Sequence, residues 1–181
     1  GFYLGHEVSG YATQTYDISE YLNYGGENVV CVRVDATLEE EWFYEGAGIY
    51  RHVWLNKASK VHVAPFGTFV HSRFTLNYDD CGGCTACVGK PQLDMAYLHI
   101  ETTVQNMGVK PEDYSLKHTL VDASGKKVAE ASVSGRQILA KDSNHTEACI
   151  EVPKPHLWSC DDPYLYTVVT EVICEGETVD S

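Results

Sequence analysis

Three cysteines, Cys81, Cys84 and Cys87, are the residues whose type and spacing most directly suggest chemistry. Two Cys-x-x-Cys steps share the middle cysteine, and the small residues between them would let three thiolates converge on one ion or cluster. A ferredoxin-like run would need a further cysteine at position 91, where the chain has Pro91, and zinc would need a fourth ligand. The alternative is a loop with three free thiols. We therefore predict no cofactor and keep a metal at this loop as the competing hypothesis.

An acidic and aromatic loop is the second candidate site. Three glutamates at positions 39–41 precede Trp42, Phe43 and Tyr44. Carboxylates accept hydrogen bonds from sugar hydroxyls, and flat rings cover the apolar face of a pyranose. The competing interpretation is a solvated loop whose rings pack under their own strand. Glu41 and Trp42 are the candidate substrate-binding residues of this loop.

No spacing in the sequence indicates a catalytic residue. The chain has no glycine loop that would cradle a phosphate, no Gly-x-Ser-x-Gly nucleophile turn and no pair of histidines at metal-binding spacing. No arrangement of Ser, His and Asp is supported by spacing either. We therefore assign no catalytic residue to this chain.

Charge and hydropathy exclude two classes of partner. The net charge is -13, so the average field repels a phosphate backbone, and the 13 basic residues form no stripe that would bind nucleic acid. No apolar run approaches the roughly 20 residues that span a bilayer, so no membrane partner is expected. Seven cysteines in a chain of this length favour a reducing compartment over a disulfide scaffold, and we expect a cytoplasmic location.

The elements that must position these residues are predicted to be strands. Strand-favouring residues are plentiful, and residues 29–35 show period-2 alternation with valines at 30, 32 and 34. Short strands at regular spacing, separated by turn signals and without helical patterns between them, indicate a β-sandwich. The expected strands are 2–6, 29–35, 46–55, 61–63, 69–76, 96–106, 114–122, 127–134, 144–152 and 164–174.

The sequence divides into two predicted domains. The run Ala-Pro-Phe-Gly at 64–67 breaks the strand pattern, so we place the domains at 1–64 and 65–181. The second domain carries a Gly/Cys/Asp-rich loop insertion at 77–93. Its last strand would begin near Val179, which gives a truncated final strand.

Several runs together resemble a known family. Residues 45–55, EGAGIYRHVWL, resemble the signature near the end of the sugar-binding domain of glycoside hydrolase family 2, and its Gly-Ala-Gly-Ile-Tyr-Arg core is closest to the β-galactosidase branch. Further runs resemble the family in the same order along the chain: YDISEYL at 16–22, ENVVCVRVD at 27–35, VHVAPFGT at 61–68, PHLWS at 155–159 and PYLY at 163–166.

This resemblance implies the end of a jelly-roll domain followed by an immunoglobulin-like β-sandwich. In the family, catalysis belongs to a TIM barrel that follows these domains, where two glutamates hydrolyse β-glycosides with retention and the acid/base stands in an Asn-Glu dipeptide. None of the six asparagines of this chain is followed by Glu. The resemblance therefore implies a non-catalytic fragment that scaffolds the TIM barrel of the same polypeptide, with a β-linked carbohydrate as substrate of the parent enzyme.

The resemblance also bears on contacts with sugar and with other chains. A residue of the loop before the signature reaches the active-site sugar in some members, which adds Asp35 to Glu41 and Trp42 as a substrate-binding candidate. A partial jelly-roll has unpaired edges, so we expect a homo-oligomer or poor packing of residues 1–45. A free-standing carbohydrate-binding or adhesive β-sandwich is the alternative function, and a metal or redox module at the cysteine loop is a third.

Overall fold

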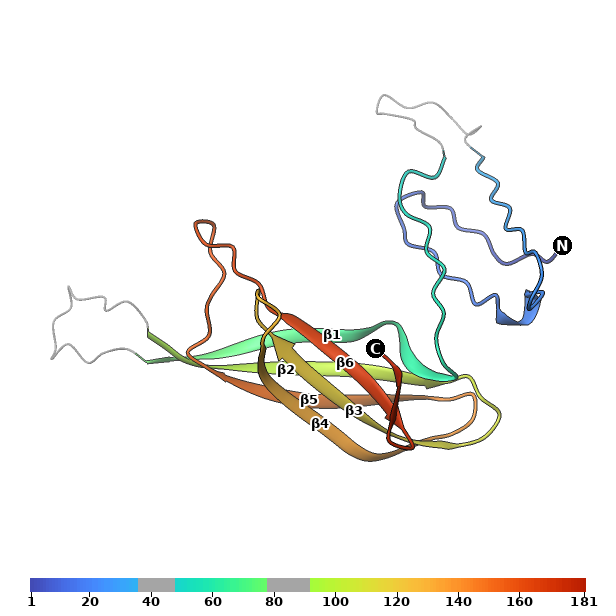
Figure 1. The fold of residues 1–181 in the computed structure, drawn as a ribbon. Helices are drawn as coiled ribbons and strands as arrows, with labels where there is room; N and C mark the ends of the chain where they lie inside the picture. Colours follow the sequence, from blue (N-terminus) through green and yellow to red (C-terminus); the bar gives the residue numbers. More distant parts are fainter. Residues whose placement is uncertain (36–47, 78–91) are drawn as a thin grey trace, which may run out of the picture. The chain divides into compact units, whose positions relative to one another are not determined.

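The computed structural model describes residues 1–35, 48–77 and 92–181. The described residues form two compact units, Gly1–Asn56 and Lys57–Ser181, which Figure 1 shows with the chain coloured from its N-terminus in blue to its C-terminus in red. The observed division lies between Asn56 and Lys57, and the domain division after residue 64 stays a prediction.

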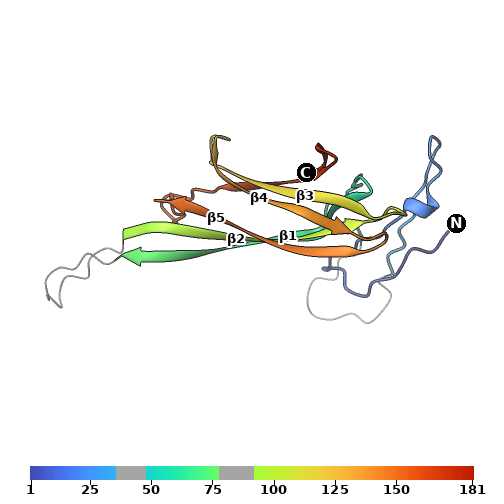
Figure 2. The same ribbon diagram turned by 90° about the horizontal axis from the view of Figure 1, so that it is seen from below.

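The second unit is a sandwich of two antiparallel sheets. The first sheet has the order β1-β2-β5, and the second has the order β4-β3-β6-β7. Figure 2 shows β1, β2 and β5 as one layer beneath β3 and β4. The strands are β1 (Val61–Asn77), β2 (Gln92–Asn106), β3 (Glu112–Val121), β4 (Lys127–Ile138), β5 (Ser143–Pro153), β6 (Thr167–Cys174) and β7 (Glu177–Asp180).

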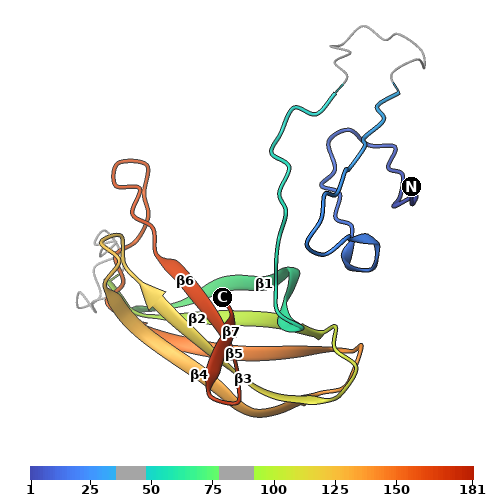
Figure 3. The same ribbon diagram turned by 45° about the vertical axis from the view of Figure 1, so that its right-hand side comes forward.

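The connections give the sandwich its topology. The chain changes sheet between β2 and β3, between β4 and β5, and between β5 and β6, as in the Greek-key connections of immunoglobulin-like sandwiches. The all-β class predicted from the sequence is confirmed. β6 and β7 form a terminal hairpin, visible in Figure 3 beside the C-terminus, and β7 begins two residues before the predicted Val179.

The core follows from alternation along the strands. In β3, Tyr114, Leu116, His118 and Leu120 are buried while the residues between them are only partly covered. These inward side chains meet buried aliphatic residues of the other sheet, such as Ile100 of β2. Each fully buried aliphatic side chain contributes roughly 1.5–3 kcal/mol relative to an exposed one, so this interface between the sheets stabilises the second unit.

One core residue is titratable. His118 is fully buried, and its Nδ1 lies 3.0 Å from Thr170 Oγ1 on the neighbouring strand β6. Its Nε2 has no hydrogen-bond partner among the described residues. Burial disfavours the imidazolium and therefore lowers the pKa of His118 below its usual 6.5.

Stability should therefore depend on His118 in mildly acidic solution. Because the unfolded chain binds a proton near pH 6.5 and the folded chain only at lower pH, the free energy of unfolding should fall as pH drops below about 6.5 and level off below the folded-state pKa. Urea unfolding between pH 7.5 and pH 5 measures this slope. His118→Asn should flatten it, and the exposed control His6→Asn should leave it unchanged.

The carboxylates whose pKa values are shifted act in a lower pH range. Hydrogen bonds and neighbouring lysines lower the pKa values of Glu130 and Glu171 below their usual 4.5, so their contributions to stability are lost only as pH falls through more acidic values. If the free energy of unfolding of His118→Asn still falls between pH 7 and pH 5, the assignment of this pH dependence to His118 is wrong.

Two irregular sites replace breaks that the sequence suggests. The strand predicted at 127–134 ends too early, at Ser134-Gly135, a dipeptide typical of turns. β4 instead continues to the fully buried Ile138, and a register shift opposite Tyr114 and Leu116 absorbs Gly135 at φ 67°. A bulge of this kind bends a strand without ending it.

The second irregular site is in β1, where pairing with β2 jumps from Val63 to Thr68 and the strand continues through the predicted break. A Cβ at Gly67 would lie 2.6 Å from the carbonyl oxygen of Ala64 and 2.8 Å from that of Thr103. Only glycine fits this close approach of two backbones.

The first unit contains a single short helical element among its described residues. Ser19–Tyr21 forms a 3-10 turn, η1, and the Asp17 carboxylate accepts a hydrogen bond of 2.9 Å from the Ser19 amide. Rings of Phe2 and Tyr21 lie 4.8 Å apart. No helix in the described ranges of the chain is both long and apolar enough to cross a lipid bilayer.

The strands predicted at 2–6, 29–35 and 46–55 are wrong over the residues that the structure describes, because none of these residues belongs to a sheet. Val30, Val32 and Val34 do alternate, but they are 65%, 62% and 50% exposed. Alternation specifies which side chains share a face, whereas a sheet also needs a hydrogen-bonded neighbour, which the pattern of one segment does not supply.

Candidate functional site

Asp35 is the predicted substrate-binding residue that the structure describes. Its Oδ2 lies 2.9 Å from Nη2 of Arg33, with side chains 49% and 88% exposed. Such a surface pair contributes at most about 1 kcal/mol and leaves the carboxylate accessible. Glu41 and Trp42 lie outside the described residues, so a sugar contact by these three stays a prediction.

The predicted metal ligands Cys81, Cys84 and Cys87 also lie outside the described residues. Within the described ranges, no group of three or more His, Cys, Asp or Glu side chains is arranged to hold a metal ion. Cysteines in the described part, such as Cys149 and Cys160, are free thiols. The metal hypothesis stays a prediction confined to residues 81–87.

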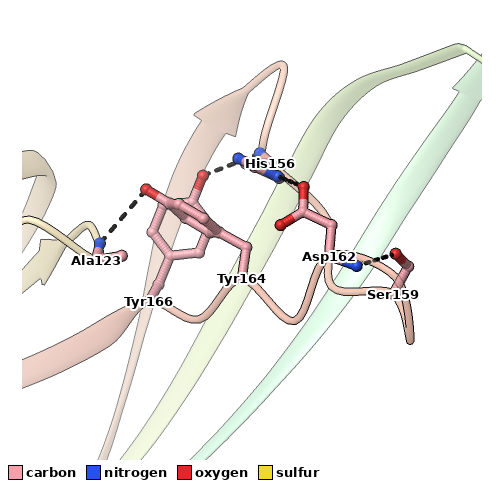
Figure 4. Close-up of polar contacts among 6 residues, drawn as sticks. All are labelled: Ala123, His156, Ser159, Asp162, Tyr164 and Tyr166. Atoms are coloured by element: carbon pink, nitrogen blue, oxygen red, sulfur yellow. Dashed lines mark hydrogen bonds and ion pairs between the residues drawn. The ribbon is translucent and has the colours of Figure 1, made fainter.

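The loop between β5 and β6, residues 154–166, is the most organised candidate site of the second unit. Figures 1 and 3 show that it projects beyond the ends of the strands. A projecting segment of this length needs contacts of its own to hold one conformation, because it has no sheet neighbours. The side chains drawn in Figure 4 supply these contacts.

A histidine, an aspartate and a serine close the loop on itself. Nε2 of His156 lies 2.5 Å from Oδ2 of Asp162. The Asp162 amide donates a hydrogen bond to Oγ of Ser159 over 3.0 Å, and the Ser159 amide donates to the Asp162 carbonyl over 2.9 Å. A catalytic triad needs the imidazole to accept the serine proton, whereas this hydroxyl accepts from a backbone amide. In these contacts His156 pairs with Asp162, and Ser159 pairs with the backbone of Asp162, which fixes the turn.

Two tyrosines tie the same loop to the sandwich. The Tyr164 ring stacks on the His156 ring at 4.0 Å and 11°, and its hydroxyl accepts a 3.4 Å hydrogen bond from the Ala123 amide in the β3–β4 turn. The Tyr166 hydroxyl accepts a 2.9 Å bond from the His156 amide, and its side chain packs against the core cluster that contains Ile100. Core packing and hydrogen bonds thus attach the loop to the sandwich.

Three large apolar side chains of this ordered loop are exposed. Leu157 is 47% exposed, Trp158 is 58% exposed and Leu165 is 67% exposed. Exposed large apolar side chains held in one conformation are typical of surfaces that contact another protein segment. We call these three exposed side chains the 157/158/165 surface.

Sequence reasoning identifies the PHLWS and PYLY runs but not this geometry. Five residues lie between His156 and Asp162, and this spacing gives no signal of a side-chain pair, because the two side chains would lie about 20 Å apart in a strand and on different faces of a helix. The signal that was available is the proline and aromatic content of 153–166, which indicates an ordered loop rather than a flexible linker.

Comparisons with known proteins find glycosyl hydrolases that are similar to this chain over nearly its whole length. A family model described as Glycosyl hydrolases family 2 matches residues 89–181. The chain is 36% identical over 99% of its length to the β-galactosidase BoGH2A of Bacteroides ovatus, of which it covers 19%. It is 27% identical over 100% of its length to a β-galactosidase of Thermoanaerobacter pseudethanolicus, of which it covers 22%.

A solved structure agrees in fold. A glycosyl hydrolase family 2 member from Bacteroides cellulosilyticus superimposes with a TM-score of 0.79 and 28% identity, covering 98% of this chain and 22% of that one. The chain spans about a fifth of the length of the curated relatives that it matches.

Proposed function

Because the chain belongs to family 2 of the glycosyl hydrolases, we propose that it is a non-catalytic part of a longer β-galactosidase-like enzyme and that it supports the catalytic domain. Retaining hydrolysis needs two carboxyl groups on either side of the glycosidic bond, and this chain has no Asn-Glu dipeptide of the kind that carries the acid/base in the family. The chain therefore acts through binding and positioning.

The observation that carries the proposal is the 157/158/165 surface. A tryptophan and two leucines stand exposed on a loop that the contact between His156 and Asp162, stacked rings and core packing already order. Preordering removes most of the entropic cost that a mobile loop would meet on docking. The proposed occupant is the catalytic domain of the same polypeptide, because the relatives are about five times longer than this chain.

The sugar specificity is proposed from the relatives and from residues 45–55. Both curated relatives described above are β-galactosidases, and the Gly-Ala-Gly-Ile-Tyr-Arg run is closest to that branch. The proposed substrate class of the whole enzyme is therefore a terminal β-galactoside.

A chimera tests the function. The 181 residues replace the aligned fifth of the Bacteroides ovatus β-galactosidase, and hydrolysis of nitrophenyl β-galactoside is measured for the chimera, for the enzyme with that fifth deleted, and for the 181-residue chain alone. The chimera should be active, and the other two should not. Hydrolysis by the purified chain alone, or equal activity of the chimera and the deletion variant, would overturn the proposal.

A further inference from the structure

The edge strands of the two sheets meet on one side of the sandwich. β1 is an edge strand of the first sheet, and β7 is an edge strand of the second. β7 has four residues, and among the described strands it pairs with β6 alone. An edge strand leaves a row of backbone amides and carbonyls without a strand neighbour. A strand as short as β7 therefore depends on other groups that bond to its free edge.

Two long-range hydrogen bonds join β7 to the start of β1. Oγ of Ser59 donates a hydrogen bond of 2.7 Å to the carbonyl of Val179. The amide of Val63 donates a hydrogen bond of 2.8 Å to Oδ2 of Asp180. Each bond pairs a backbone group of one segment with a side chain of the other, so side chains close the sandwich here in place of a strand ladder. We call these two hydrogen bonds the Ser59/Asp180 seam.

Apolar packing accompanies the seam. Val61 is buried in the core cluster that contains Val104 and Val172, and Val63 and Val179 pack against the same cluster. The hydrogen bond to Asp180 is partly shielded from water, and hydrogen bonds to an ionised acceptor are stronger than those between neutral groups. Displacing either segment would therefore break the seam and uncover the same core cluster.

The segment before β1 has further anchors on the sandwich. The carbonyl of Lys60 accepts a hydrogen bond of 2.7 Å from the amide of Met107, which follows β2. Nδ1 of His62 lies 2.8 Å from the carbonyl of Ser59. Because the second unit begins at Lys57, residues 57–63 are the part of the sandwich that directly follows the first unit. We call residues 57–63 the joining segment.

We propose that the Ser59/Asp180 seam makes the joining segment and β7 a single cooperative element, which opens and closes as one. Val179 and Asp180 are neighbours in β7, so release of β7 removes the partners of Ser59 and of the Val63 amide together. Release of the joining segment likewise removes the groups that bond to the free edge of β7. Because coupling is reciprocal, a contact that stabilises either closed segment stabilises the other by the same factor. This device does not rest on the proposed role in a longer enzyme.

The test is amide hydrogen exchange of the ¹⁵N-labelled 181-residue chain, followed by NMR at several low urea concentrations. Cooperative elements exchange through a common opening, with one opening free energy and one urea dependence. The amides of Val63 and of β7 should share such an opening, and it should occur more often than the opening that exposes Leu116 in the core of β3. Different openings for Val63 and β7 would show that each segment moves by itself and that the proposal is wrong.

Variants of the seam test the coupling directly. Asp180→Ala should raise the frequency of the common opening about tenfold or more, since it removes a charged acceptor. Ser59→Ala should raise it about two- to tenfold, and this rise should appear at the Val63 amide, to which Ser59 does not bond. Asp180→Asn keeps a side-chain oxygen that can accept from Val63, so its effect should be smaller than that of Asp180→Ala.

The matched control is Glu177→Ala, which removes an exposed acidic side chain from the same strand. It should change the exchange rates of Val63 and of β7 by less than about twofold, because a surface substitution of this kind has a small effect on stability. If Ser59→Ala accelerates exchange in β7 and leaves Val63 unchanged, or if Glu177→Ala acts as strongly as Asp180→Ala, the seam does not couple the two segments.

Discussion

Leu116→Ala should lower the free energy of unfolding by about 2–5 kcal/mol. Leu116 is fully buried at the centre of β3, in the cluster with Val104, Tyr114 and Val172. Truncation removes the burial of the side chain and leaves a cavity between two sheets, and neither sheet can collapse into it because the strand register fixes their backbones. Urea unfolding followed by circular dichroism measures the loss.

The matched control is Leu165→Ala, the same chemical change at a site that is 67% exposed. It should change the free energy of unfolding of the isolated chain by less than about 0.5 kcal/mol. Equal losses in the two variants would mean that the sandwich core is not where the structure places it.

Trp158→Ala should have its largest effect in the chimera and not in the isolated chain. Tryptophans at the centre of protein interfaces contribute 2 kcal/mol or more to binding, so truncation should shift the docking equilibrium by roughly thirtyfold and lower nitrophenyl β-galactoside hydrolysis accordingly. The stability of the 181-residue chain should change little, since the side chain is 58% exposed there.

Two leucine variants distinguish a role in docking from a general effect of removing exposed apolar surface. Leu157→Ala, within the 157/158/165 surface, should also lower the activity of the chimera. Leu139→Ala, at a comparably exposed site after β4, should not. Full activity of both Trp158→Ala and Leu157→Ala would show that the catalytic domain does not dock on this loop.

Much of the sandwich could be predicted from the sequence because its alternation is strong. The pattern around Tyr114, Leu116 and Leu120 places β3 within two residues of its observed start. The predicted end of the strand at Ser134-Gly135 was wrong because a glycine at positive φ occurs in bulges as well as in turns. Only the pairing of β4 with β3 distinguishes the two.

The candidate site was less predictable than the fold. The pair of His156 and Asp162 depends on a loop closure that no sequence period reports, and the stacking of His71 on His99 depends on the register between β1 and β2. Register between β1 and β2 is a long-range property, so a list of scattered histidines gives no sign of it. Family resemblance identified the PHLWS run but not the contacts that order it.

Tyr166 links the packing of the core to the conformation of the exposed loop. Its ring packs on the core cluster and its hydroxyl fixes the His156 amide at the base of the exposed loop. A core substitution that moves the Tyr166 ring should therefore also move the His156 amide, so mutations deep inside the sandwich can affect the proposed assembly surface. During sequence divergence the core and the loop must change together, and the variation tolerated at one restricts the variation tolerated at the other.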